Sequence, residues 1–173
     1  MNRFPVALIL GALSLPALAG PQRAVVEAQL DGIEQPPTAK SLKAIPGVVD
    51  ELLEIAQDSD ASRTHRAKAV HALGHFPQAE TRAVLESALL GDDAKLARGA
   101  AYALGNGWGD AAVPTLRSAL ASTDTQLRIA AAASLGNVGS AQARVALDQR
   151  LAIESVPAVR ESIQASITRT GDR

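Results

Sequence analysis

Small and apolar residues recur along this chain at a spacing that predicts pairs of helices. Between Leu96 and Leu120, alanines and leucines at helical spacing lead into the turn-forming segment Asn106–Asp110, and a second helical run begins at Ala111. Apolar residues three and four positions apart, interrupted by glycine, are typical of two helices joined by a turn. We therefore predict a helical hairpin over this stretch.

The hairpin pattern repeats. Leu-Gly pairs stand at 73–74, 104–105 and 135–136, a period of 31 residues, and Ile167-Thr168 follows 32 residues later. The leucines that match between second helices are Leu85, Leu116 and Leu147, followed by Leu89, Leu120 and Leu151. A period of roughly 20 to 50 residues with matched apolar positions indicates a stacked repeat array. We predict an all-α fold, an α-solenoid of about four helical hairpins over residues 38–170, with a degenerate first repeat and a single last helix.

Capping residues mark the expected helix ends. Ser62, Asp93 and Asp124 each stand twelve residues before a repeat glycine, where their side chains can accept hydrogen bonds from the first helical turn. We expect the three repeat glycines to end these helices in the left-handed conformation. Pro114 is expected near the start of a second helix, where its missing N–H does little harm.

The N-terminal segment has the pattern of an export signal. Arg3 precedes the apolar run Val6–Leu15, and Ala17-Leu18-Ala19 is a small-x-small cleavage site. We predict a signal peptide over residues 1–19, with a retained anchor as the alternative, and a periplasmic or secreted mature protein without an integral membrane span. Residues 20–37 are expected to form a linker or a loosely ordered arm, in which Ala24–Leu30 could make a brief helix that Asp31-Gly32 and Pro36-Pro37 interrupt.

Composition narrows the function classes. The chain has 173 residues, 47% hydrophobic and only 2% aromatic, with 20% charged residues and a net charge of −1. This charge balance provides no field that would attract nucleic acid or a membrane surface. Alanine and leucine fill the apolar positions, which permits close helix packing. Cysteine is absent, which excludes disulfides and thiol catalysis.

The segments 65–74 (HRAKAVHALG) and 127–136 (LRIAAAASLG) resemble HEAT-like repeats of the phycocyanobilin-lyase type. A unit of that family reads approximately Val-Arg-x-x-Ala-Ala-x-Ala-Leu-Gly, followed by a turn and a second helix with spaced leucines. The resemblance covers about residues 38–169 and departs from the pattern at Ala97 and Thr168. It implies a solenoid of stacked helical pairs, a scaffold used mostly for binding and occasionally as part of an enzyme.

Catalytic and metal-binding motifs are weak. His71 and His75 stand four residues apart, with His65 before them, but Gly74 places His75 beyond the expected helix end. Iron-binding hydroxylases built from HEAT repeats carry His-Glu pairs in several repeats, and no His-Glu dipeptide occurs here. No Gly-x-Ser-x-Gly turn or phosphate-binding loop is present. We predict no catalytic residues, no metal and no cofactor.

Two features allow a structural or a binding interpretation. Arg66, Arg128 and Arg160 share one repeat position, where they either bond the turns of neighbouring repeats or form a ligand-binding row; we favour the structural role. Trp108 lies in a turn, where its ring either packs over the neighbouring turn or anchors a partner, and we favour packing.

The pattern favours an exported, non-enzymatic scaffold that binds a protein, of unknown identity, through a concave row of second helices. Residues off the leucine stripe of these helices should be exposed. Among them the row before the leucines is Arg82, Val113 and Arg144, and the row after them is Glu86, Arg117 and Asp148. With Trp108, the charged members are the candidate partner-binding residues, and their alternating signs suit protein better than nucleic acid. The alternative is an accessory subunit or a lyase-like enzyme acting on a small ligand or chromophore.

Overall fold

The computed structural model describes residues 21–32 and 38–171. Every regular element in these ranges is helical. The helices are α1 (Pro21–Leu30), α2 (Ala39–Lys43), α3 (Val48–Gln57), α4 (Arg63–Leu73), α5 (Ala79–Leu90), α6 (Ala94–Gly107), the 3-10 helix η1 (Gly109–Ala112), α7 (Val113–Ala119), α8 (Thr125–Val138), α9 (Ala141–Ile153) and α10 (Pro157–Gly171). The all-α solenoid expected from the repeat is confirmed.

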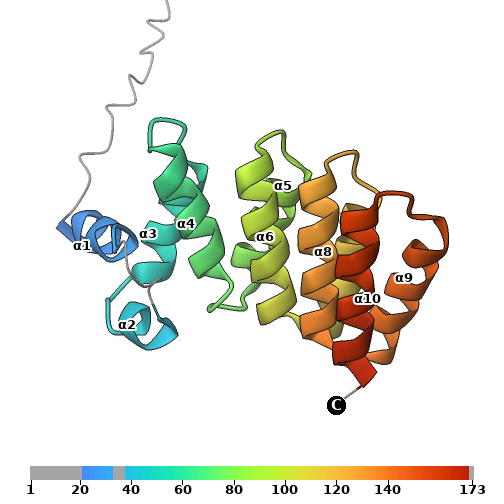
Figure 1. The fold of residues 1–173 in the computed structure, drawn as a ribbon. Helices are drawn as coiled ribbons and strands as arrows, with labels where there is room; N and C mark the ends of the chain where they lie inside the picture. The colour runs from blue at the N-terminus through green and yellow to red at the C-terminus, as the bar shows by residue number, and fades with distance from the viewer. Residues whose placement is uncertain (1–20, 33–37, 172–173) are drawn as a thin grey trace, which may run out of the picture.

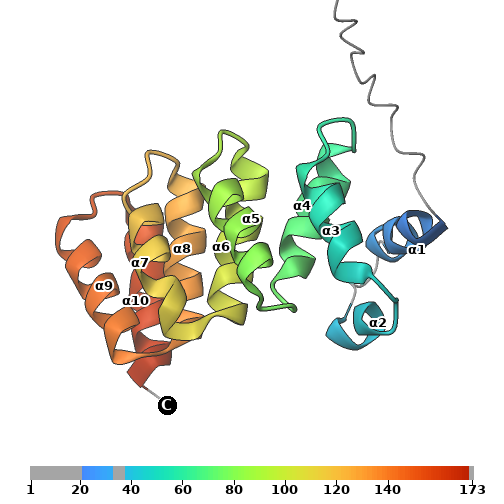
Figure 2. The same ribbon diagram turned by 180° about the vertical axis from the view of Figure 1, so that it is seen from behind.

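The helices form two parallel layers. Helices α4, α6, α8 and α10 lie side by side in one layer (Figure 1), here called the first-helix row. Helices α3, α5, α7 and α9 form the other (Figure 2), the second-helix row. The hairpins α2–α3, α4–α5, α6–α7 and α8–α9 follow one another along the array, and α10 ends it as a single helix.

One continuous core fills the space between the two rows. Leu85, Leu116 and Leu147 of the second helices are fully buried, as the matched spacing predicts. The first helices contribute mainly alanines, such as Ala100 and Ala131. Small side chains let neighbouring first helices approach closely, because little side-chain volume separates the backbones.

The predicted N-caps are confirmed. Ser62 Oγ accepts a hydrogen bond from His65 N–H at 3.1 Å. Asp93 Oδ1 accepts from Lys95 and Leu96 N–H at 2.9 and 3.2 Å, and Asp124 caps α8 in the same way. These bonds satisfy backbone donors that the first turn leaves unpaired. Helices α4, α6 and α8 therefore begin where their own capping side chains specify.

The repeat glycines have a different role from the one expected. Gly105 and Gly136 lie inside α6 and α8, and Gly74 has a right-handed φ of −59°. A methyl group added at Gly105 would lie 2.8 Å from Ser134 Cβ of the next first helix. The two equivalent glycines are equally crowded: a methyl group added at Gly74 would meet Ala103, and one added at Gly136 would meet Ser166. These glycines permit close helix contact. Gly74 ends α4 as expected, but none of the three is left-handed, and Gly105 and Gly136 do not end their helices.

Residues 21–32 also differ from the expected linker or arm. Helix α1 packs on α3 and α4 and buries Val26 and Leu30. Arg23 pairs with Asp58 at the end of α3. Pairing between Asp31 and His65, with 2.6 Å between Oδ1 and Nε2, attaches the end of α1 to α4. The short helix therefore covers the first end of the array, as terminal repeats of a solenoid require.

The predicted signal peptide, residues 1–19, lies outside the described residues, as do residues 33–37. Within the described ranges, no helix combines the length and the apolar character needed to cross a bilayer.

Candidate interaction surface

The two rows differ in how closely their helices pack. First helices meet through glycine contacts, whereas grooves open between consecutive second helices. The groove between α3 and α5 has a volume of about 540 Å³, that between α5 and α7 about 270 Å³, and that between α7 and α9 about 160 Å³. A further groove, of about 380 Å³, lies on the first-helix side where α1 meets α4 and α6.

This packing corrects the expected curvature. In a curved stack of helical pairs, the row with the closer spacing lies on the inner side of the bend and the more widely spaced row on the outer side. Glycine contacts bring the first helices together, so the inner side belongs to the first-helix row. The expectation that the second helices line the concave side is therefore wrong; they form the outer, grooved side, here called the second-helix face.

Arg82 and Glu86 connect adjacent repeats. The guanidinium of Arg82 pairs with Glu86 at 2.9 Å and also donates a hydrogen bond at 2.9 Å to the carbonyl of Ala111 in the next repeat. Glu86 accepts a hydrogen bond at 3.1 Å from the hydroxyl of Thr115 on α7. Both side chains are about one-third exposed. They are therefore less available to a partner than the sequence suggests.

The other candidates of the second-helix face divide into exposed and buried residues. Arg117 is exposed on α7. Arg144 and Asp148 form an exposed pair on α9 with 3.5 Å between Nε and Oδ2. Val113, which the sequence placed in the same row as Arg82, is buried beside the leucines instead. The structure thus brings Arg117, Arg144 and Asp148 to the part of the face formed by α7 and α9.

Trp108 lies at the end of α6. Its ring is partly buried and packs on the hydrophobic core. Its backbone N–H donates to Leu104 and its carbonyl accepts from Ala111, so the residue also connects α6 to η1. This environment agrees with the favoured interpretation of Trp108 as a packing residue.

Large hydrophobic side chains that sequence reasoning missed also lie on the second-helix row. Leu90 at the end of α5 is 76% exposed, Val145 on α9 is 53% exposed, and Ile153 at the end of α9 is 75% exposed. Val145 lines the groove between α7 and α9, next to Arg117. The detectable signal in the sequence is an aliphatic residue outside the leucine stripe, at a position that the leucine spacing leaves exposed.

The three equivalent arginines are bonded in two repeats and unbonded in the third. Arg128 pairs with Glu154 at 3.0 Å and donates to the carbonyls of Ser122 and Thr123. Arg160 donates to the carbonyls of Leu151 and Glu154 at 2.8 and 2.7 Å. These are the structural bonds that the sequence predicts. Arg66 makes none of them, and its Nε is buried without a hydrogen-bond partner in the described part of the chain.

Glu154 supplies the carboxylate of this network, and its side chain is only 1% exposed. Burial alone would raise the pKa of Glu154. Hydrogen bonds from the Val156 N–H, Arg150 and Arg128 outweigh that effect and lower the pKa to about 2. Glu154 is therefore an ionised structural residue that binds two guanidinium groups, with 2.6 Å between its Oε2 and Arg150 Nη2.

The three histidines are not brought together at one site. His65 pairs with Asp31. His71 lines the groove near α1, where desolvation and, to a lesser extent, repulsion from His75 lower its pKa. In the ranges that the structure describes, no cluster of three or more His, Asp or Glu side chains could hold a metal. The absence of a metal remains a prediction.

The repeat and the fold are shared with known proteins. A family model described as HEAT repeats matches residues 38–105 and 89–168. Human deoxyhypusine hydroxylase, solved in complex with glycerol, is 28% identical over 72% of this chain and 44% of its own length, with a TM-score of 0.62. This chain therefore spans less than half of that enzyme. A search of curated proteins found no match.

Two further structures share the fold at lower identity. The complex of CpcE and CpcF of phycocyanin lyase from Nostoc sp. PCC7120 is 18% identical, covers 94% of this chain and 71% of its own, and has a TM-score of 0.58. An engineered protein is 22% identical over 87% of this chain and 72% of its own, with a TM-score of 0.54. The repeat matches extend over most of the described residues, and this chain belongs to the HEAT-repeat family.

Proposed function

We propose that this chain is a non-enzymatic scaffold that binds a protein partner through the second-helix face, mainly between α7 and α9. One observation carries the proposal: Leu90, Val145 and Ile153, three of the four exposed large hydrophobic residues in the described ranges, lie on this row. A partner that covers these aliphatic side chains would remove apolar surface from water, which favours association. HEAT repeats generally mediate protein interactions, which agrees with this use.

The chemistry around Val145 suits a protein surface. The groove beside it is lined by Val113, Pro114 and Ala146 and can accept one aliphatic or aromatic side chain. Arg117, Arg144 and Asp148 are exposed around this apolar centre. An apolar centre with a polar, mixed-charge rim is the usual composition of a protein interface. Arg117 and Arg144 would contact acidic residues of the partner, and Asp148 a basic one.

Site-specific photo-crosslinking tests this proposal. A photoreactive amino acid placed at Val145 should crosslink one protein from the producing cell. The same amino acid at Lys95, which is exposed on α6 in the first-helix row, is the matched control and should not. Reversing both Arg117 and Arg144 to Glu should reduce the Val145 crosslink while the helical circular dichroism signal stays unchanged, because exposed charges contribute little stability. Crosslinking from Lys95 alone would place the partner on the first-helix row and contradict the proposal.

Export is part of the same proposal, supported by Arg3, the apolar run Val6–Leu15 and Ala17-Leu18-Ala19. The mature protein would begin near Gly20 and act in the periplasm or outside the cell. Intact-mass measurement of the protein from its producing cell tests this. We expect a mass that corresponds to loss of residues 1–19, and an exported protein that retains Met1 would contradict cleavage.

A second candidate, an accessory subunit or lyase-like enzyme acting on a small ligand, is favoured by the cavity between α3 and α5. It has the volume of a small-molecule site and contains the unbonded guanidinium of Arg66. Purification of the protein from its producing cell, followed by mass spectrometry of small molecules released on denaturation, tests this candidate. A stoichiometric bound compound would support it.

A further inference from the structure

Arg66 occupies the same repeat position as Arg128, two periods earlier, but lacks the bonds of that arginine. The guanidinium of Arg128 is surrounded by the Glu154 carboxylate and two backbone carbonyls. Arg66 forms no hydrogen bond or ion pair within the described residues, and its Nε is buried. A buried donor without an acceptor is costly and rare in folded proteins. This one calls for an acceptor from outside the chain.

Alignment of the repeats shows which residue stands where the carboxylate partner of Arg66 would be expected. The residue that stands two periods before Glu154 is Asp92, whose side chain is one methylene shorter. Asp92 is exposed and does not pair with Arg66. Within the described residues, no carboxylate takes the place beside Arg66 that Glu154 has beside Arg128. A cavity of about 540 Å³ takes its place, whose lining includes Arg66, Asp92 and residues of α3 and α5.

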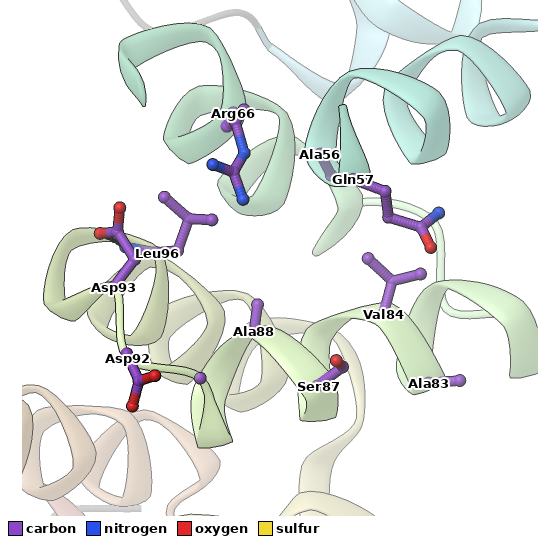
Figure 3. A pocket seen from close by; sticks show the side chains of 11 residues that line it. Ala56, Gln57, Arg66, Ala83, Val84, Ser87, Ala88, Asp92, Asp93 and Leu96 are labelled. Atoms are coloured by element: carbon purple, nitrogen blue, oxygen red, sulfur yellow. Dashed lines mark hydrogen bonds between the residues drawn. The ribbon is translucent and has the colours of Figure 1, made fainter. Parts of the chain in front are cut away.

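The cavity combines one cation with an apolar wall. In Figure 3, the Arg66 side chain extends from α4 between Leu96 and Val84, with Ala88 below it. The labelled carboxylates of Asp92 and Asp93 lie at the edge of the cavity, beyond Leu96 (Figure 3). Its volume falls in the range of about 300 to 1,000 Å³ typical of small-ligand sites.

The two acidic residues at the edge do not neutralise Arg66. Asp93 is already paired with Arg63, with 2.8 and 2.9 Å to its two carboxylate oxygens. Hydrogen bonding from Arg63 lowers the pKa of Asp93 to about 2. Asp93 is therefore ionised near neutral pH, and its negative charge at the edge of the cavity disfavours ligands with two negative charges. A single carboxylate that reaches Arg66 past this edge matches the charge of the site.

We propose that the cavity between α3 and α5 binds one external carboxylate on Arg66, with the aliphatic body of the ligand against Val84, Ala88 and Leu96. The bound carboxylate takes the position that Glu154 has on Arg128. Arginine suits this role because its fork of N–H donors matches the two oxygens of a carboxylate. The ligand is a branched aliphatic acid, either free or as the C-terminal residue of a peptide chain.

This inference does not depend on the proposed protein scaffold, because the cavity is tested with defined probes and without partner capture. The first probe is 4-methylpentanoate, and its neutral control is 4-methylpentanamide. The second probe is the peptide acetyl-Ala-Val-Leu with a free C-terminus, and its control is the same peptide with a C-terminal amide. Binding is measured by NMR titration of the backbone amide signals of the 15N-labelled protein.

We expect at least one acid to shift the signals of residues 87–96 and the Arg66 Nε–H, while its amide binds at least about tenfold more weakly, as loss of a charge-assisted hydrogen bond predicts. Binding of 4-methylpentanoate would assign the site to a free acid, and binding of the peptide alone would assign it to a chain terminus. Equal binding of acid and amide, or no binding of either acid at millimolar concentration, would overturn the proposal.

Three variants separate a binding role from a structural one. Arg66→Gln should weaken acid binding at least about tenfold, because it removes the cation while keeping polar length. Ala88→Leu fills the cavity and should weaken binding of the acid although Arg66 is intact. Arg169→Gln removes an exposed arginine at the far end of the array, in α10, and should leave binding unchanged. Dispersed amide spectra verify that each variant is folded, and unchanged affinity in a folded Arg66→Gln variant would overturn the proposal.

Discussion

Gly99 and Gly105 provide a matched test of the close packing between first helices, because both lie in α6. A methyl group added at Gly99 would lie 3.5 Å from the Ala67 carbonyl oxygen and 3.6 Å from a methyl carbon of Val70, which is ordinary contact. At Gly105 it would lie 2.8 Å from Ser134 Cβ and 2.9 Å from the Ser134 carbonyl oxygen. The same substitution therefore makes ordinary van der Waals contacts at one site and meets a crowded backbone at the other.

The expected free energies have opposite signs. Replacing glycine by alanine inside a helix stabilises by roughly 0.5 to 1 kcal/mol, because alanine has fewer unfolded conformations to lose. Gly99→Ala should keep that gain. At Gly105 an overpacked interface costs roughly 1 to 3 kcal/mol. Ser134 cannot easily move away, because it is fully buried and its hydroxyl donates a hydrogen bond to the Ala130 carbonyl at 2.8 Å. We expect Gly105→Ala to be destabilised by up to about 2 kcal/mol overall.

Urea titration followed by circular dichroism measures both free energies of unfolding under one condition. For a chain of this size, each kcal/mol corresponds to a change of roughly 2 to 4 °C in Tm, so a thermal scan is an independent check. The informative quantity is the difference between the two variants, since the gain in helix propensity is largely shared. If Gly105→Ala proved as stable as Gly99→Ala, the close contact between α6 and α8 would not be the reason for glycine at that position.

Three further predictions concern the buried charges and the repeat. The pKa of Glu154 is lowered from 4.5 to about 2, which corresponds to about 3 kcal/mol of folding stability. This stability should be complete above pH 4.5 and lost as the pH falls toward 2. The Glu154→Gln variant should therefore lack that part of the acid-unfolding curve. Arg128→Gln should cost roughly 2 to 4 kcal/mol, because it removes one partner of a buried ion pair, whereas unbonded Arg66→Gln should cost almost nothing in the same denaturant titration. Deleting residues 94–124, one period, should leave a shorter folded helical protein by circular dichroism, because Asp93 then caps α8; an unfolded product would show that the repeat boundaries are misplaced.

The repeat and the helix starts could be predicted because their causes are local. An N-cap needs only Asp93 or Asp124 and the N–H groups two and three residues later, so a short window of sequence contains all of it. The role of Gly105 could not be predicted in this way. It depends on Ser134 in the next first helix, and the same glycine is equally compatible with a helix end until that neighbour is placed.

The candidate surface could also be predicted in part. The charges of the second helices could be located from the leucine spacing, and Arg117, Arg144 and Asp148 are exposed as expected. The role of Arg82 in joining two repeats could not be predicted, because the Ala111 carbonyl that it contacts lies 29 residues away in the next repeat. Which row is concave depends on the relative spacing of two rows, which no single helix encodes. The docking of residues 21–30 on the array was not predicted, because the contacts that hold α1, such as Arg23 with Asp58, span 35 residues.

The 31-residue spacing of contacts also has a kinetic consequence. The side chains of Lys95 and Thr64, and of Asn137 and Asn106, meet across 31 residues, so each interface between neighbouring first helices closes a loop of nearly the same length. The entropy of loop closure depends only weakly on length and is therefore almost equal for every interface. Folding order is then set by the quality of each interface and not by topology. Helices α6, α8 and α10, which interlock at Gly105 and Gly136, should form the first stable unit, and hydrogen exchange should be fastest at the α1 end.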